Sequence, residues 1–257
     1  MSIFSFLSNE FIKNEYKGYF IINKIRRIII MNSILVKRLT RDIKEIQKNP
    51  IENIYYIPDE SNISNGYAMI IGHEDTPYAY GYYFFEFQFP DNYPFSPPKV
   101  VFYTNDGKTR LNPNFYISGK VCLSVLNTWK GEGWTSCQSI RSILLILSTT
   151  LNDKPLLNEP GLTEKHRDFE NYQNMICYKN IDTAIIGMLN HRYFNQKFEI
   201  FKDIIHDTFR KNRVNITTNA IKLQDKIENN TIIAFGLYSS RYLVDFDTMI
   251  NCLKSLE

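Results

Sequence analysis

YYFFEFQFPDNYPFSPPKVVFYT, residues 82–104, is the stretch that decides the fold of this chain. Its first eight residues alternate between two sides of an extended chain. One side is aromatic throughout: Tyr83, Phe85, Phe87 and Phe89. The other side carries Phe84, Glu86 and Gln88, and this period of two predicts a half-buried antiparallel strand. Four prolines follow within residues 89–100; because proline fixes φ and removes a donor, they predict an ordered crossing rather than a helix or central strand.

Further strands and helices surround this stretch. Runs with strand character, separated by polar or proline-rich turns, occupy residues 54–57, 67–72, 82–89 and 99–104. Consecutive strands of this kind predict an antiparallel meander that leaves one face for helices to cover. Apolar residues at helical spacing predict those helices over residues 33–48, 139–151 and 163–189. The expected fold class is therefore α+β.

The chain continues well beyond these elements. Phenylalanine and isoleucine residues recur at helical spacing from Phe194 to Phe209, which predicts a mainly helical extension that packs or presents an apolar stripe. We therefore divide the chain into an N-terminal extension (1–31), a core domain (32–190) and a C-terminal extension (191–257).

Composition excludes several classes of protein. The chain has 257 residues, 44% of them apolar, and its net charge of +3 is too small a bias to indicate nucleic-acid binding. Because no apolar run reaches the ~18 to 20 residues that a bilayer core requires, we expect no membrane span, and we expect no secretory leader. The cysteines show neither metal-site spacing nor disulfide-rich density: Cys122, Cys137, Cys177 and Cys252. Reduced thiols without a bound metal are the expectation, in the cytosol or the nucleus.

Cys122 stands in the run NPNFYISGKVCLSVL, residues 112–126. A lone cysteine is most often a small buried hydrophobe. However, LNPNFYISGKVCLSVL and WKGEGWTSCQSI, with YPFSPPKV before them and a leucine-rich helix after them, resemble the ubiquitin-conjugating enzymes. Members of that family carry ubiquitin as a thioester on one cysteine. The similarity covers about residues 33–190, and it implies the family's UBC fold for the core domain. The long stretch from Cys122 to Trp134 is similar to the larger members, which have extended loops and C-terminal additions.

The resemblance implies roles for residues around Cys122. Cys122 matches the thioester-forming cysteine, and Asn114 matches the asparagine of the family's His-Pro-Asn motif, in which Asn112 here replaces the histidine. A thioester is already activated, so sulfur-to-sulfur transfer needs an accessible thiolate and no tightly coupled histidine base. Asn114 either donates to the oxyanion during lysine transfer, an effect worth ~3 kcal/mol, or braces the loop. The two roles are compatible.

Glu159, in LLNEPG, matches a family position that is commonly acidic and lies beside the cysteine. An attacking lysine must lose a proton, and its free pKa of about 10.4 makes that costly at neutral pH. Glu159 is therefore expected to orient the lysine, while desolvation favours the neutral amine. The alternative is a solvated loop glutamate without a catalytic role.

The family's docking elements also have counterparts here. Lys37, Arg38 and Arg41 on the first helix are expected to supply basic contacts, and Phe95 is the expected apolar anchor for a RING-type ligase. Ser136 and Cys137 replace the family's proline and alanine, which changes the surface that selects a ligase. The implied partners are ubiquitin, its activating enzyme, a ligase and substrate lysines. No cofactor is expected on this chain, because ATP is used by the activating enzyme.

Three other functions are compatible with this reading of the residues. The chain could conjugate a different ubiquitin-like modifier. It could instead be a catalytically inactive ubiquitin-binding module on the same fold, but such modules typically lack the cysteine that is present here. A cysteine hydrolase would cleave a ubiquitin fusion without activating enzyme or ATP, and it would need a histidine base.

Overall fold

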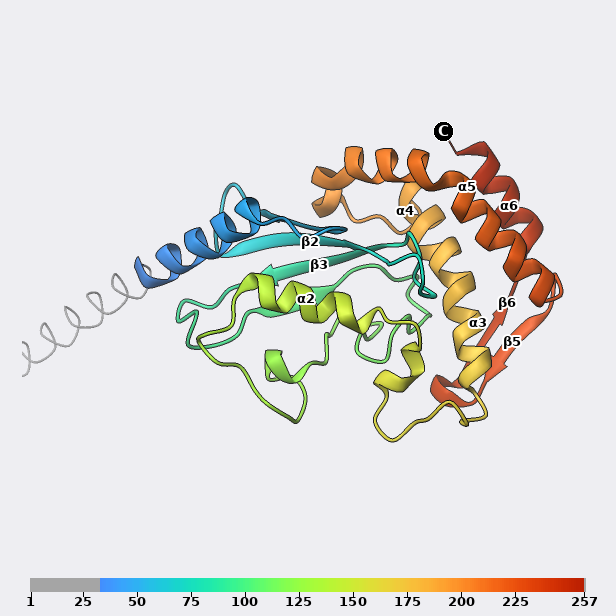
Figure 1. Cartoon of the computed structure of the whole chain (residues 1–257), viewed down its shortest axis with the longest axis horizontal. Helices are drawn as coiled ribbons and strands as arrows, with labels where there is room; N and C mark the ends of the chain where they lie inside the picture. Colours follow the sequence, from blue (N-terminus) through green and yellow to red (C-terminus); the bar gives the residue numbers. More distant parts are fainter. Residues whose placement is uncertain (1–32, 257) are drawn as a thin grey trace, which may run out of the picture.

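The computed structural model describes residues 33–256, so the expected N-terminal extension over residues 1–31 lies outside the described residues (Figure 1). A four-stranded antiparallel sheet runs in chain order β1-β2-β3-β4, as the sequence predicted. Its strands are β1 (Ile54–Pro58), β2 (Asn65–Ile71), β3 (Tyr82–Gln88) and β4 (Lys99–Phe102). The register pairs Ile70 with Tyr83 and Phe85 with Phe102. The predicted α+β class with C-terminal helices is confirmed.

The inner face of the sheet belongs to the buried apolar core of the chain. The ring of Phe85 lies 5.3 Å from Phe102 and 5.2 Å from Phe115, measured between centroids. Helix α2 (Ile140–Thr150) adds Ile143, Leu144 and Leu147 to the same buried cluster. The helix over residues 33–48 buries Leu35, Leu39 and Ile46 there. Both predicted amphipathic helices therefore bury their apolar faces in one core.

The prediction that β3 is half buried is wrong, because both faces of this strand are covered. Phe84 and Glu86, on the outer face, are as inaccessible as Phe85 and Phe87. The short 3-10 helix η4 (Gln196–Phe201) supplies the cover: the ring centroid of Phe198 lies 4.8 Å from that of Phe84. The covering residues lie about 110 positions further along the chain. The alternation of residues within β3 therefore could not predict that its outer face is covered.

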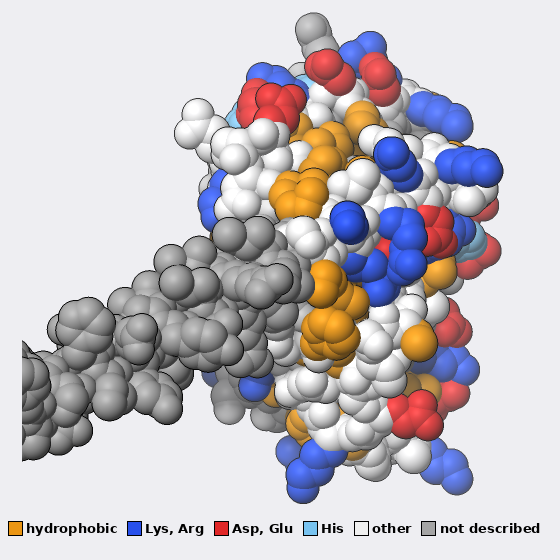
Figure 2. Space-filling view, turned by 90° about the vertical axis from the view of Figure 1, so that its left-hand side faces the viewer, with side chains coloured by type: hydrophobic (Ala, Val, Ile, Leu, Met, Phe, Trp, Pro, Cys, Tyr) orange, Lys and Arg blue, Asp and Glu red, His pale blue; other side chains and the backbone are white. Residues whose placement is uncertain are grey.

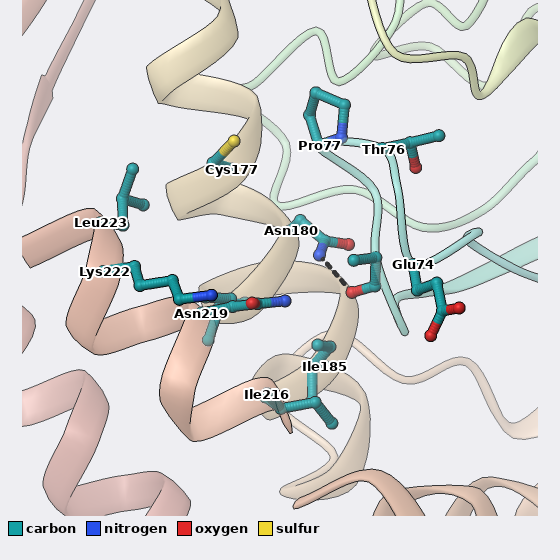
Figure 3. Close-up of a pocket in the computed structure, with 12 residues that line it drawn as sticks. Glu74, Thr76, Pro77, Cys177, Asn180, Ile185, Ile216, Asn219, Lys222 and Leu223 are labelled. Atoms are coloured by element: carbon teal, nitrogen blue, oxygen red, sulfur yellow. Dashed lines mark hydrogen bonds between the residues drawn. The ribbon is translucent and has the colours of Figure 1, made fainter. Parts of the chain in front are cut away.

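Helix α3 (Phe169–Lys179) continues through a π-helical segment, η3 (Asn180–Ile186), into α4 (Gly187–Leu189). The helix predicted to begin at residue 163 therefore begins later, after turns. At the π-helical segment the buried Asn180 side chain donates to the Ala79 carbonyl at 2.8 Å and accepts from the Tyr83 hydroxyl at 2.6 Å. A pocket between this segment, helix α5 (Lys202–Lys226) and residues 74–79 is visible in Figure 3, with the Asn180 bond at one side.

The C-terminal extension contains a β-hairpin that the sequence analysis did not predict. Helix α5 (Lys202–Lys226) is followed by β5 (Ile232–Phe235), β6 (Ser240–Leu243) and helix α6 (Phe246–Ser255). Figure 1 shows the hairpin beside α3, and the Asn171 side chain donates to the Ala234 carbonyl at 2.9 Å. Neither strand alternates apolar and polar residues, since β5 reads IIAF and β6 reads SRYL, so the period-two signal is absent. Within residues 33–256, no helix combines the length and hydropathy needed to span a membrane.

Candidate active site

Cys122 and Asn114 hold each other in place through two hydrogen bonds. The Cys122 backbone N–H donates to the Asn114 carbonyl at 2.8 Å, and the Asn114 side-chain amide donates to the Cys122 carbonyl, also at 2.8 Å. This second bond is the bracing contact expected of Asn114. An amide nitrogen carries two N–H groups, so a second donor remains for an oxyanion.

Asn112 anchors the loop that carries Asn114 to the buried core. Its side chain is fully buried and donates to the Tyr78 hydroxyl at 2.8 Å and to the Thr150 carbonyl, at the end of α2, at 2.7 Å. Its side-chain oxygen accepts from the Asn114 backbone N–H at 2.9 Å. The residue that replaces the family's histidine therefore connects α2 to Asn114, as expected of a structural position.

The thiol of Cys122 is protected and not permanently activated. The residue is only 5% exposed, so the accessible thiol expected from the sequence is not seen in this conformation. Its Sγ donates to the Thr128 carbonyl at 3.3 Å. Burial raises the pKa of this thiol, and the charge of Glu159 raises it further, whereas Lys120 and Arg110 oppose the shift. Among the described residues no histidine contributes to this pKa. Because S–H is a weak donor, turning the thiol away from Thr128 to meet a thioester breaks only one weak hydrogen bond.

Glu159 lies near Cys122, but it is not a freely solvated loop residue. Its side chain is 32% exposed, and its Oε2 accepts a 2.6 Å hydrogen bond from the Tyr238 hydroxyl of the C-terminal extension. The guanidinium of Arg110 reaches to 4.0 Å from the same oxygen. It stands over two tyrosine rings, 3.9 Å from the centroid of Tyr116 and 4.4 Å from that of Tyr238.

Arg110 and Tyr238 are the neighbours of the site that sequence reasoning missed. Arg110 belongs to the DGKTR segment, and no feature of that segment predicts that its charge lies near Cys122. Tyr238 is 79 residues from Glu159 and has no counterpart in the part of the chain that carries the resemblance. No local pattern could have placed it there. Within residues 33–256, no group of three or more His, Cys, Asp or Glu side chains is arranged to hold a metal ion.

The three docking elements expected from the sequence lie next to one another. The Trp134 indole donates to the Pro94 carbonyl at 2.7 Å, which joins the Trp134 loop to the Phe95 loop. Phe95 itself is 64% exposed. Ser136 and Cys137 are also exposed beside them. Figure 2 shows basic and hydrophobic side chains close together on this end of the molecule.

One of the expected basic contacts has a different role. Lys37 and Arg41 are exposed on the first helix, as a docking role requires. Arg38 is not: its side chain is 9% exposed and pairs with the buried Asp42 at 2.8 Å. It also donates to the Ser136 carbonyl at 2.7 Å, and to that of Gln138. The expectation that Arg38 supplies a basic contact to a partner is therefore corrected, because it pairs with Asp42 on its own helix and bonds to the carbonyls of Ser136 and Gln138 in the loop.

The fold and site together define a class of protein: a four-stranded meander that presents a cysteine braced by an asparagine eight residues earlier. Comparison with known proteins agrees, since the profile of the family described as ubiquitin-conjugating enzyme matches residues 38–185. The chain belongs to the ubiquitin-conjugating enzyme family.

Individual relatives point the same way. The chain is similar to ubiquitin-conjugating enzyme E2 Z of Xenopus tropicalis, with 41% identity over 60% of this chain and 50% of that protein. The human protein of the same name is 39% identical over 59% of this chain and 44% of its own length. A probable ubiquitin-conjugating enzyme of Caenorhabditis elegans is 32% identical over 76% of this chain and 28% of its own length. The chain thus spans about half the length, or less, of these curated relatives.

Proposed function

We propose that this chain accepts ubiquitin from an activating enzyme as a thioester on Cys122 and transfers it to a substrate lysine or to a ligase. The observation that carries the proposal is the Cys122–Asn114 pair, which is held by reciprocal hydrogen bonds and which the resemblance matches to the family's catalytic positions. Because the thiolate is the nucleophile, the raised pKa of the thiol means that charging proceeds through a minor thiolate fraction, which suffices for attack on a thioester that is already activated.

The chemistry needs no cofactor on this chain. In charging, the Cys122 thiolate attacks the thioester carbonyl held by the activating enzyme; a new S–C bond forms, the old one breaks, and the departing thiolate takes up a proton. ATP is used earlier, by the activating enzyme. In discharge to lysine, Glu159 orients the attacking amine and the second Asn114 donor stabilises the oxyanion.

The proposed partners follow from the exposed surface. Lys37 and Arg41 would steer an activating enzyme, while Phe95 would enter a pocket of a RING-type ligase. Ser136 and Cys137 lie beside Phe95 and would shape the choice of ligase. The described cysteines are all free thiols, which supports a reducing compartment such as the cytosol or nucleus.

A charging assay tests the proposal. The protein is incubated with ubiquitin-activating enzyme, ATP and labelled ubiquitin, and compared on non-reducing and reducing gels. We expect a thiol-sensitive adduct that Cys122→Ser abolishes or converts to a thiol-resistant ester. Cys137→Ser is the matched control, because Cys137 is an exposed thiol outside the site and its loss should leave the adduct intact. An adduct that survives unchanged in Cys122→Ser refutes the assignment, and an adduct formed only with another ubiquitin-like modifier corrects the cargo.

A further inference from the structure

The turn of the C-terminal hairpin, residues 236–239, reaches back to the active site. Tyr238 in this turn donates its hydroxyl to Glu159 Oε2 at 2.6 Å and places its ring 4.4 Å from the Arg110 guanidinium. Tyr238 therefore contacts both the positive charge of Arg110 and the negative charge of Glu159, which act in opposite directions on the pKa of the Cys122 thiol. The match to the family model ends at residue 185, so it assigns the turn no role.

The turn is held in an unfavourable backbone conformation. Tyr238 has φ 62° and Ser239 has φ 49°, in the left-handed region that side-chain-bearing residues rarely adopt. Such a conformation persists where surrounding contacts over-determine it, and it recurs at functional sites. Here the Leu237 N–H donates to the buried carboxylate of Asp168 at 2.8 Å. The ring centroid of Tyr172, on α3, lies 6.0 Å from that of Tyr238. The contacts thus fix the position of the Tyr238 hydroxyl on the Glu159 side.

The Tyr238 bond leaves half of the Glu159 carboxylate available. Oε2 is occupied by Tyr238, whereas no described residue hydrogen-bonds to Oε1. The adjoining residue is fixed as well, because the Asn158 amide donates to the Thr150 carbonyl at 2.8 Å. A carboxylate anchored through one oxygen on a fixed loop can present the other to an incoming amine in one orientation.

We propose that Tyr238 is a positioning residue for lysine transfer, holding Glu159 so that its free oxygen orients the attacking amine beside Cys122. This inference rests on the proposed function. In the step concerned, the amine nitrogen bonds to the thioester carbonyl carbon, the C–S bond breaks, and Cys122 leaves as a thiolate that takes up the proton released by the nitrogen. The C-terminal extension then supplies part of the acceptor site.

Tyr238→Phe tests this, because it removes the hydroxyl and keeps the ring stacked with Arg110. Tyr242→Phe, on the same hairpin, is the matched control: its hydroxyl makes a long 3.4 Å contact to the Lys108 carbonyl, away from Glu159. Single-turnover discharge of the charged protein is measured with free lysine over a range of concentrations and, separately, with a small thiol. We expect Tyr238→Phe to charge normally, react normally with the thiol, and lose about tenfold in its rate with lysine.

A double-mutant cycle separates positioning from a merely structural role. Glu159→Gln should slow lysine discharge, and adding Tyr238→Phe to it should cause little further loss, since the tyrosine acts through the glutamate. Equal lysine rates in Tyr238→Phe and wild type, or parallel losses of charging, thiol and lysine rates, would overturn the inference while leaving the carrier function intact. A wild-type protein that never forms the thiol-sensitive adduct refutes the proposed function and this inference with it.

Discussion

Asn112 shows how one buried residue can adapt a motif to its surroundings. Its amide makes four bonds at once: two as donor, to Tyr78 and Thr150, and two as acceptor, from the Asn114 N–H and, at 3.4 Å, from the Asn158 amide. An imidazole offers only two ring nitrogens, so a histidine in this position could not make all four. The departure from the family's motif is therefore matched by the partners around it.

Asn112→Ala is expected to destabilise the fold by about 2 kcal/mol, because it deletes all the hydrogen bonds of a buried amide and leaves a cavity. Thr150 keeps a second donor in Asn158, which limits the loss. Urea unfolding followed by circular dichroism measures the change. Asn251→Ala, at an exposed position of α6, is the control and should lie within about 0.5 kcal/mol of wild type. Equal midpoints for the two variants would contradict the structural role.

At the scale of elements, the outer face of the sheet and the short helix η4 form one unit. Lys197 of η4 donates to both carboxylate oxygens of Glu86, at 2.9 and 3.0 Å. The Tyr103 hydroxyl donates to the same carboxylate at 2.6 Å. Burial alone would raise the pKa of Glu86, but these hydrogen bonds and the lysine charge outweigh burial and lower it. A charged residue on the outer face of a strand is thus kept ionised under a cover of aromatic rings.

Lys197→Met is expected to lower the free energy of unfolding by roughly 1–2 kcal/mol at pH 7, because the charge of Glu86 loses its ion-pair partner. The effect is limited because the lysine side chain is nearly half exposed to solvent. A lowered folded pKa contributes stability above the ordinary value of 4.5, and this contribution is lost as pH falls through the folded pKa. The difference between variant and wild type should therefore shrink below about pH 4.5.

Unfolding free energies measured from pH 7 to pH 3 check this expectation. Lys202→Met is the control, because Lys202 and Glu199 form a surface pair with both side chains nearly half exposed. It should change stability by less than about 1 kcal/mol at every pH. A Lys197→Met effect that is independent of pH would mean that packing, and not the ion pair, supplies the stabilisation.

At the scale of the whole molecule, the C-terminal extension is continuous with the core. Phe198 is fully buried against the sheet, and the hairpin contacts α3 and the Glu159 loop. Figure 1 shows α5, α6 and the hairpin lined along one end of the sheet and α3. The same buried apolar cluster contains residues of the core domain and of the C-terminal extension. The two parts should therefore unfold together.

Phe198→Ala is expected to lower the free energy of unfolding by about 3–5 kcal/mol, as for other buried phenylalanines. Both tryptophans of the chain, Trp129 and Trp134, lie in loops of the catalytic core and report on it selectively. Their fluorescence and the far-UV circular dichroism should shift to lower denaturant together. Ile200→Ala, 48% exposed on the same segment, should have little effect. A tryptophan transition that stays in place would show that the extension unfolds separately.

Much of the fold could be predicted because its signals are local. The strands at 54–57, 67–72 and 82–89 and the helix at 139–151 correspond closely to β1, β2, β3 and α2, since periods of two and 3.6 residues report the backbone directly. The burial of Glu86, the internal role of Arg38 and the hairpin could not be predicted. Arg38 meets Ser136 across 98 residues, and such a contact depends on how whole elements pack.

The sequence by itself indicated the strands and helices of the core domain and singled out Cys122 and Asn114, because the pattern and the motif lie in short stretches of chain. Only the tertiary structure decided what surrounds Glu159 and what covers the sheet. Tyr238 contacts Glu159 across 79 residues, so this contact requires the closure of a long loop. The entropy lost in closing that loop is offset by packing throughout the extension. No local pattern records that balance.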